Sequence, residues 1–279
     1  MNVFTTILLA TLCLSWQSLS ANEGLNAESM AEQYFVARSS LQTFPDLVGA
    51  GEDDSDEFLY SVQQELVSLQ VRHGASIGGY KGGLIPKLSV GGVLFADGIL
   101  RGSSVIERQD YRNLMVEAEI AFRMCKPVRE PIANVVALKS ATCMVYPAIE
   151  LPDAAIGNLD ELLKDIPQLR KALIPTNMLS ASVLLGAGKD PAEMDINSLP
   201  VRVSIDGTEI AHRDAEPPNG DIWARTLWVI NEFILAQGYE LTAEHIIIPG
   251  ALTGIHPGNA GSYNIDFGAL GEVTFRIVE

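Results

Sequence analysis

The chain has 279 residues, of which 47% are hydrophobic and 7% aromatic, so it is long enough to bury a sizeable core and is not disordered by composition. Its 35 acidic residues outnumber 19 basic ones, and the net charge of −16 excludes nucleic acid as a partner and disfavours anionic membrane surfaces. The same charge repels an anionic small molecule, so a site for one needs local positive charge from a cation or a lysine.

The amino-terminal segment has the pattern of an export signal. Residues 1–21 carry no charged side chain, and an almost unbroken apolar run from Val3 to Trp16 precedes small residues that end at Ala21. We predict a signal peptide over 1–21, cleaved near Ala21, and export to the periplasm; an uncleaved anchor and a mis-assigned start are the alternatives. No later segment is apolar over the roughly 20 residues that a span needs, so we expect no stable membrane span once the leader is removed.

The next segment predicts a small helical arm over residues 22–77. Apolar residues recur at helical spacing over 26–41 and 55–72, and the loop between them carries one proline and two glycines. Asp53 or Ser55 is expected to cap the second helix, because acidic residues follow in its first turn.

The composition changes at residue 78, where four glycines surround Lys81. We predict an irregular loop over 78–83 rather than a helix or a regular strand. Beyond it, β-rich composition or alternation predicts strands over seven segments: 93–95, 114–124, 141–149, 182–185, 201–205, 245–248 and 273–278.

Turn and helix signals complete the pattern of the segment 78–279. Asp206-Gly207 between two β-rich runs predicts a hairpin. Helices are expected over 158–173 and 221–237, with Gly238 as a stop for the second. The sum predicts an α+β fold, in which residues 78–279 form a β-rich catalytic-type domain with a rolled or barrel-like core.

Two glutamates on one strand are the first candidates for chemistry. Alternation in the segment 116–122 places Glu117 and Glu119 on the same face, about 6 to 7 Å apart at their Cα atoms. Adjacent carboxylates repel one another, and a cation compensates that repulsion. A solvated strand face is the competing interpretation.

A third acid, Glu150, closes a strongly apolar strand between Pro147 and Pro152. Such a carboxylate is placed more like a ligand than a solubilising charge, although a simple strand exit is equally compatible. Three carboxylates without a neighbouring His or Cys form a hard oxygen site, which suits Mg²⁺ or Mn²⁺ better than zinc.

Lys81 is the candidate for the local positive charge. Its ammonium can pair with a substrate carboxylate or, if desolvated, lose enough basicity to transfer protons. A lysine on the surface is the alternative. After leader removal, two cysteines remain, Cys125 and Cys143. We expect small buried thiols, with a disulfide as the alternative in an oxidising compartment.

Six short segments stand in a recognisable order along the chain. They are Gly79-Tyr80-Lys81-Gly82-Gly83-Leu84, Gly92-Val93-Leu94-Phe95-Ala96-Asp97, Glu117-Ala118-Glu119-Ile120-Ala121, Pro147-Ala148-Ile149-Glu150, Gly250-Ala251-Leu252 and Asp266-Phe267-Gly268-Ala269-Leu270-Gly271. The ordered set resembles the 2-keto-4-pentenoate hydratase and 4-oxalocrotonate decarboxylase family, within the fumarylacetoacetate hydrolase-like superfamily. This resemblance covers nearly the whole chain after the leader and implies a mixed β-roll with flanking helices.

The resemblance also implies a site. One Mg²⁺ or Mn²⁺ would be held by Glu117, Glu119 and Glu150, with Lys81 as the catalytic lysine. The implied substrate contacts are Lys81, Leu84, Asn177 and Ser180. The partner would be a small 2-oxo or 2-hydroxy acid, which chelates the cation through its carboxylate and adjacent oxygen.

The implied activity is that of a hydro-lyase. It would hydrate a short unsaturated 2-hydroxy or 2-oxo acid, such as 2-hydroxypenta-2,4-dienoate, through a metal-stabilised dienolate. A 2-oxo acid decarboxylase of the same family shares that intermediate and is one alternative. An exported, non-catalytic relative that binds a small acid with the metal is another. The sequence is also compatible with a homo-oligomer.

Overall fold

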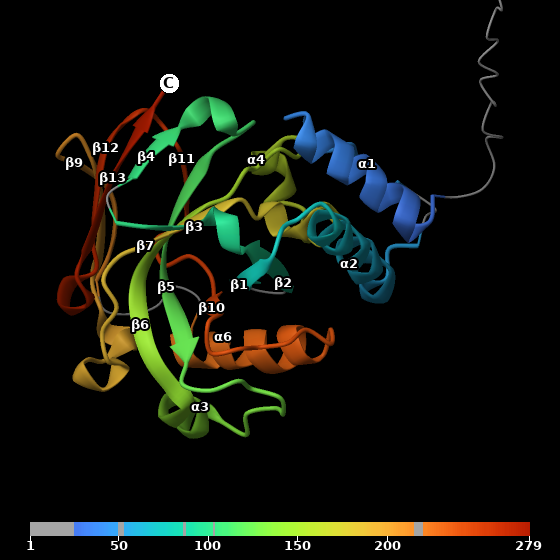
Figure 1. Ribbon diagram of the computed structural model, residues 1–279. Helices are drawn as coiled ribbons and strands as arrows, with labels where there is room; N and C mark the ends of the chain where they lie inside the picture. The colour runs from blue at the N-terminus through green and yellow to red at the C-terminus, as the bar shows by residue number, and fades with distance from the viewer. Residues whose placement is uncertain (1–24, 50–52, 86–87, 103, 215–219) are drawn as a thin grey trace, which may run out of the picture.

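The computed structural model describes residues 25–49, 53–85, 88–102, 104–214 and 220–279 (Figure 1). The predicted signal peptide over 1–21 lies outside the described residues. The described chain begins with two helices, α1 (Ala27–Ser39) and α2 (Asp56–Arg72), and the side chain of Ser55 caps the second. In these ranges, no helix combines the length and the hydrophobicity that crossing a membrane requires.

The larger of two sheets has eight strands, in the order β2-β1-β10-β5-β6-β7-β3, with β11 paired to β5. Only β1 with β10 and β3 with β7 run parallel among these pairs, so the described sheet is mixed, as the resemblance implied. Its strands are β1 (Ile77–Ile85), β2 (Leu88–Phe95), β3 (Ile99–Arg101), β5 (Met115–Met124), β6 (Thr142–Leu151), β7 (Ser182–Leu185), β10 (Ile246–Ile248) and β11 (Ile255–Pro257).

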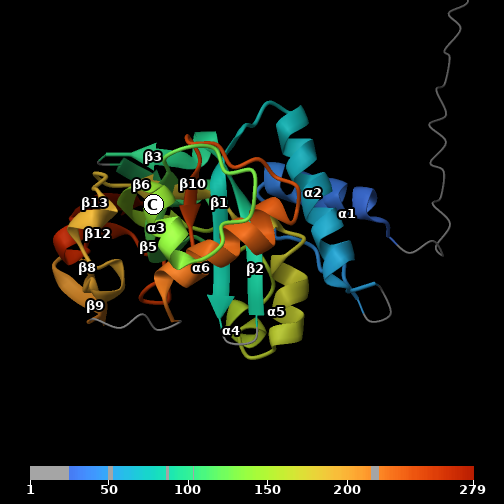
Figure 2. The ribbon, with the colours of Figure 1, turned by 90° about the horizontal axis from the view of Figure 1, so that it is seen from below.

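The second sheet has five strands in the order β4-β13-β12-β8-β9. They are β4 (Ser104–Glu107), β8 (Val201–Ile205), β9 (Thr208–Arg213), β12 (Gly261–Asp266) and β13 (Glu272–Val278). The predicted hairpin at Asp206-Gly207 is confirmed, with φ of 50° and 79° at these residues, as a primed turn requires. Figures 1 and 2 show this sheet on the opposite side of the molecule from α1 and α2.

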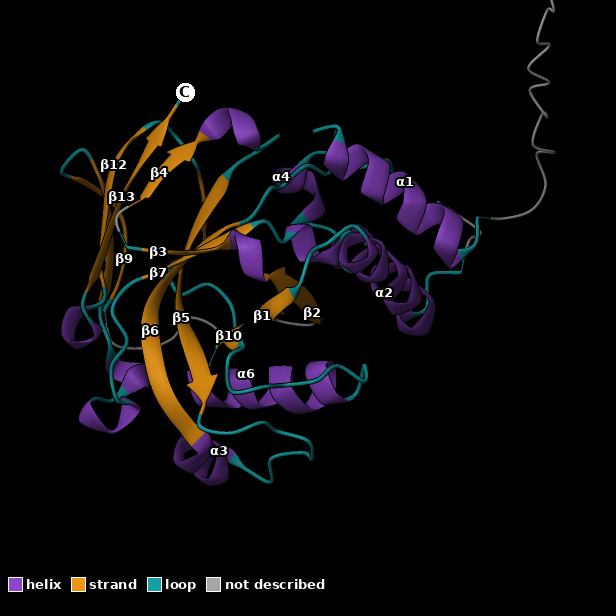
Figure 3. Ribbon diagram, viewed as in Figure 1, coloured by secondary structure: helices purple, strands orange, loops and turns teal. Residues whose placement is uncertain are grey.

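Four further helices flank the sheets (Figure 3): α3 (Val135–Ala141), α4 (Leu159–Leu162), α5 (Ile166–Leu173) and α6 (Ile222–Trp228). The single helix predicted over 158–173 is wrong, because Pro167 lacks an N–H and starts a new helix with Asp165 as its cap. The helix predicted over 221–237 is confirmed. It begins at the Asp221 cap, continues after α6 as a π-helical segment over Val229–Leu235, and is followed by Gly238 at φ 77°.

The glycine-rich segment around Lys81 corrects the sequence prediction. It is not an irregular loop but the middle of β1, between β2 and β10. A Cβ on Gly79 would lie 2.2 Å from the carbonyl oxygen of Ile246, and one on Gly78 would lie 2.7 Å from the Cα of Ala96. The glycines are therefore needed because neighbouring backbones approach β1 closely, not because the chain is irregular there. Lys81 is buried in the sheet as a member of this central strand.

The helical arm packs onto the β-rich part of the chain. Buried side chains of α1 and α2 form one hydrophobic cluster with residues of α5 and β2. The buried amide of Gln63 donates hydrogen bonds from Nε2 to the carbonyls of Gly91 and Ile174, at 3.0 and 2.8 Å. Arg38 donates to the carbonyl of Ser180 at 2.7 Å. These contacts place α2 beside the segment that carries several predicted site residues.

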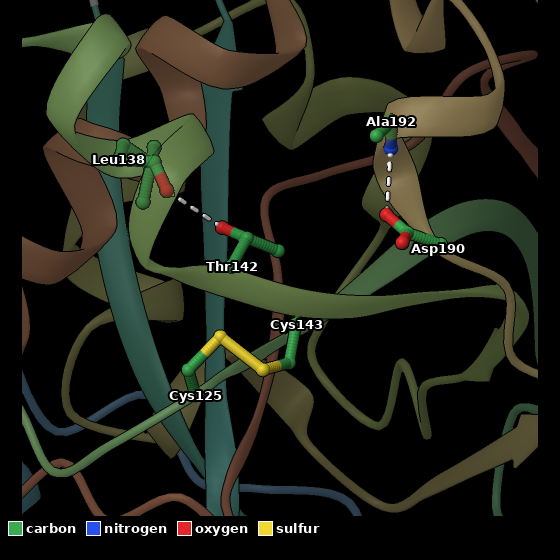
Figure 4. Close-up of a disulfide and its surroundings, with 6 residues drawn as sticks. All are labelled: Cys125, Leu138, Thr142, Cys143, Asp190 and Ala192. Carbon is green, nitrogen blue, oxygen red and sulfur yellow. Dashed lines mark hydrogen bonds between the residues drawn. A yellow bond between two sulfur atoms is a disulfide. The ribbon is translucent and has the colours of Figure 1, made fainter.

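Cys125 and Cys143 form a disulfide between the end of β5 and the start of β6 (Figure 4), with Cα atoms 4.8 Å apart. Both residues are exposed. The expectation of buried free thiols is therefore wrong, because antiparallel pairing of β5 and β6 brings the two side chains together at the solvent-facing end of the ladder.

Candidate active site

The β5–β6 ladder gathers the three predicted carboxylates. Glu117 lies directly opposite Glu150 in the antiparallel register, and alternation keeps Glu119 on the same face of β5. One carboxylate oxygen from each side chain lies within 4.8 Å of the others. Acids that are far apart in sequence thus converge on one point of the sheet.

The surroundings of these carboxylates disfavour the ionisation of Glu117 and Glu119. Glu119 is fully buried. Its Oε2 accepts a hydrogen bond from the Gly250 N–H at 2.7 Å, and its Oε1 has no hydrogen-bond partner within the described part of the chain. Burial, and next the charge of Glu150, raise the pKa of Glu117 to about 8 and also raise the pKa of Glu119. Closely spaced hard oxygens, one of them unpartnered, fit a divalent cation such as Mg²⁺ or Mn²⁺.

Lys81 extends from β1 into the same cluster. It is only 4% exposed, forms an ion pair with Glu150, and donates a hydrogen bond from Nζ to the carbonyl of Met178 at 3.0 Å. Burial by itself lowers the pKa of Lys81, but the charges of Glu150 and Glu117 outweigh it, so the net pKa lies above its ordinary value. In the cation-free protein this side chain is an ammonium.

The carbonyl that Lys81 contacts belongs to a left-handed turn. Asn177, Met178 and Leu179 have φ of 55°, 50° and 57°, a region that costs non-glycine residues about 1–2 kcal/mol each. The turn is held in place by Asn177, whose Oδ1 accepts from the Val93 N–H at 2.7 Å and whose Nδ2 donates to the Val93 carbonyl at 2.9 Å. Backbone strain is thus used to direct the carbonyl of Met178 at the lysine.

The remaining predicted substrate contacts are Asn177, Ser180 and Leu84. Asn177 is fully buried, and both ends of its amide bond the backbone of β2, so its amide holds the turn in place. Ser180 is buried but does not line the cavity described in the next paragraph. Met178 and Leu179, which lie between Asn177 and Ser180 in the sequence, do line that cavity. Leu84, in β1, pairs with Ser89 of β2, and the side chain of Leu84 lies outside the described residues.

A cavity of about 840 Å³ opens beside the carboxylates. Lys81, Glu117 and Glu150 line it together with a largely apolar wall. Two arginines that the sequence prediction missed, Arg213 and Arg225, also line it. The sequence does contain an indication that Arg225 is buried. In the predicted helix, Arg225 lies on the same face as uncharged residues that are buried in α6.

Known proteins resemble the chain in sequence. No family model matches it. It is 29% identical to 2-oxo-hept-4-ene-1,7-dioate hydratase of Escherichia coli over 239 residues, which are 80% of this chain and 86% of that protein. It is 26% identical to 2-keto-4-pentenoate hydratase of Paraburkholderia phymatum over 257 residues, which are 88% of this chain and 95% of that protein. In sequence, the chain is similar to these two hydratases of unsaturated 2-oxo acids over most of its length.

The fold of the chain also matches a solved structure. The 4-oxalocrotonate decarboxylase of Pseudomonas putida G7, complexed with magnesium and adipate, superposes with a TM-score of 0.80 at 19% identity, over 92% of this chain and 100% of that one. The likeness confirms the fumarylacetoacetate hydrolase-like α+β architecture. Glu117, Glu119 and Glu150 supply a donor set that fits one divalent cation, and the Pseudomonas putida structure holds magnesium.

Proposed function

We propose that the protein is a hydratase that acts on a short unsaturated 2-hydroxy or 2-oxo acid, with 2-hydroxypenta-2,4-dienoate as the reference substrate. The observation that carries the proposal is the convergence of Glu117, Glu119 and Glu150 beside Lys81 at one wall of a cavity. The names of its sequence relatives, both hydratases of unsaturated 2-oxo acids, support the same reaction class. The protein is accordingly an enzyme of the hydro-lyase type.

Each residue of the site has a part in this chemistry. Glu117, Glu119 and Glu150 would hold a divalent cation, which when bound would supply Lewis-acid stabilisation of the negative charge that develops on the substrate. Lys81 holds a proton on Nζ at the cavity wall, oriented by the Met178 carbonyl. It can therefore pass a proton between the 2-hydroxyl and the far carbon of the diene, which gives the unsaturated ketone to which water adds.

The test separates binding from turnover. Purified protein saturated with Mg²⁺ is expected to consume 2-hydroxypenta-2,4-dienoate. The reaction is measured as the loss of the ultraviolet absorbance of this substrate. Lys81→Ala should slow the reaction by about 100-fold or more, since positioned proton transfer contributes that much, while calorimetry shows cation binding retained. Lys164→Ala is the matched control, because Lys164 is 70% exposed and pairs with Glu161 on the surface.

The outcomes discriminate among the candidate functions. A folded, cation-loaded protein that leaves the dienoate unchanged refutes the hydratase. Release of carbon dioxide from 4-oxalocrotonate identifies a decarboxylase instead. Binding of oxalate together with the cation, without turnover of either substrate, identifies a non-catalytic binding protein.

We also propose that the protein is exported to the periplasm after removal of residues 1–21. The exposed disulfide supports this proposal, because such bonds persist mainly in oxidising compartments. Expression of the full chain in a Gram-negative host, followed by fractionation and mass spectrometry, should recover a periplasmic form that begins near Asn22. Recovery of a cytoplasmic protein that retains Met1 contradicts it.

A further inference from the structure

The charged side chains of the cavity gather around the three glutamates. Besides the lysine and the two glutamates already described, the ionisable lining residues are Arg225 of α6 and the segment 212–214 at the end of β9. Burial lowers the pKa of Arg225, and the charges of Glu119 and Glu117 oppose that shift, so this arginine lies close to the carboxylates. Burial and next the charge of Arg225 lower the pKa of Arg213, which places Arg213 in the same group.

The wall formed by α4 and α5 has the opposite character. Its lining residues are Leu159, Leu163, Leu169 and Leu173. No charged side chain from the described segment 158–173 lines the cavity. The basic residues of α5 pair elsewhere: Arg170 forms an ion pair with Asp56 at the start of α2, and Lys171 pairs with Asp54 at 3.0 Å. A carboxylate at this wall would therefore have no cationic partner among the described residues of α4 and α5.

The register of β1 and β2 shows how far the two parts of the cavity are apart. Lys81 pairs with Gly92, and Gly83 pairs with Val90, so alternate residues of β2 from Gly92 to Leu88 lie on the same face as Lys81. At about 3.3 Å per residue, Val90 lies about 7 Å and Leu88 about 13 Å along the sheet from Lys81. Both line the cavity. The cavity therefore extends along the ladder, away from the lysine.

The leucine wall stands at that distant end. In Figure 2, α4 and α5 lie near the end of β1 to which its arrow points, which is also where β2 begins. The helix α5 packs against β2, and Leu169 of α5 shares one hydrophobic cluster with Leu88 and Val90. The residues met by a ligand that extends from Lys81 along β2 thus become apolar.

Met178 lies at the boundary between the two parts. Its carbonyl accepts the hydrogen bond from Lys81 at 3.0 Å. Its side chain follows β2 away from the lysine, because a Cβ on Gly92 would lie 3.2 Å from the Cβ of Met178, and a Cβ on Gly83 would lie 2.7 Å from its Cε. The bare backbone of Gly83 leaves room for the thioether, which is apolar and adaptable.

We propose that the substrate carries a hydrocarbon group at its far end, so that the substrate class is a 2-hydroxy-2,4-dienoate extended beyond C5 by an apolar alkyl or aryl group. This inference rests on the proposed function, in which the cation and Lys81 serve the 2-oxo acid end. Leu159 and Leu173 are half-buried and Leu163 is 43% exposed, so a hydrocarbon group can cover apolar surface there, which favours binding. The cavity of about 840 Å³ lies in the upper part of the about 300–1,000 Å³ range of small-molecule sites.

The experiment measures how affinity depends on chain length. Calorimetric titration of the Mg²⁺-saturated protein uses 2-oxopentanoate, 2-oxoheptanoate and 2-oxononanoate, with 2-oxoheptanedioate as the charged counterpart of the second. We expect the affinity to rise about fourfold for each added methylene. The diacid should bind about tenfold or more weakly than 2-oxoheptanoate, because its second carboxylate would lose water without gaining a partner.

Two variants locate the effect at the leucines. Leu163→Asp places a charge at an accessible position, and Leu159→Asp adds an acid to the first turn of α4, which the helix dipole tolerates. Each should reduce the gain to less than about twofold per methylene. Val136→Asp is the matched control, because Val136 is 74% exposed in α3 and does not line the cavity.

The outcomes separate this inference from the proposed function. Affinities that do not rise with chain length, or a diacid that binds as tightly as the monoacid of equal length, overturn it. An unchanged gain per methylene in both Leu163→Asp and Leu159→Asp also overturns it. Hydration of 2-hydroxypenta-2,4-dienoate without any gain from longer chains keeps the hydratase and removes only the apolar site. Leucine-dependent binding of the longer acids without hydration removes the hydratase and keeps the apolar site.

Discussion

Replacing Glu117 with glutamine is expected to stabilise the cation-free protein near neutral pH. Burial and Glu150 raise the pKa of Glu117 from 4.5 to about 8, so the folded protein favours the protonated acid. Stability from this preference is complete below about pH 4.5 and is lost as the pH rises towards 8. Glutamine has the shape of the protonated form but never ionises, so its advantage grows through the same window.

The magnitude follows from the displacement of the pKa. One pKa unit corresponds to about 1.4 kcal/mol, and pH 7 lies about two and a half units above the ordinary value, so the expected gain is about 3 kcal/mol. At pH 5 the gain falls below about 1 kcal/mol. Urea unfolding in the presence of a chelator, at both pH values, measures it. Glu130→Gln is the control, because that glutamate is exposed.

Bound cation should cancel the stability advantage of Glu117→Gln. Mg²⁺ at about 100 times its dissociation constant stabilises a folded protein by about 2.7 kcal/mol, and a variant that has lost a ligand gains less. The advantage of Glu117→Gln should therefore disappear when Mg²⁺ replaces the chelator. The reasoning is refuted if the variant is less stable than the unmodified protein at pH 7 in chelator, or if its gain is the same at pH 5.

Three further perturbations test the framework of the site. Asn177→Ala should cost about 2–4 kcal/mol in urea unfolding, because two buried backbone groups of β2 lose their partner; a cost below about 1 kcal/mol would contradict the bracing role. Gly79→Ala should cost about 3 kcal/mol or prevent folding, whereas Gly157→Ala, with no atom within 4 Å of its added Cβ, should be nearly neutral in the same assay. Reduction of the Cys125–Cys143 bond, which links residues 18 apart, should lower the free energy of unfolding by about 3 kcal/mol, and a double Cys→Ser variant that shows no loss would contradict this.

Much of the site could be predicted because its residues stand in regular patterns. Alternation in β5 placed Glu117 and Glu119 on one face, and that strand exists as predicted. Glu150 was singled out by its position at the end of an apolar strand, and the structure places it in register with Glu117. The period-two pattern of a strand predicts the face on which each side chain lies. Antiparallel pairing of β5 with β6 then brings Glu150 next to Glu117.

The misses arise where tertiary contacts decide. Glycine propensity predicted a loop around Lys81, but close packing against Ile246 demands glycine within a strand. The amide of Asn177 bonds a strand that lies 84 residues earlier, a contact that no local pattern reveals. Nothing local marks Arg213 as buried, because its burial comes from packing that the β9 sequence does not encode.

The like-charged pair across the β5–β6 ladder has a consequence for how the chain reaches its native state. Aligning Glu117 with Glu150 brings two acids together at the moment the strands zip, and a slip of one residue would turn one of them to the other face of the sheet. Conditions that neutralise the pair, by proton or by divalent ion, favour the correct alignment over the slipped one. Refolding should consequently be faster, and yield more correctly aligned protein, in magnesium than in chelator. The ion would then assist folding as well as the proposed reaction.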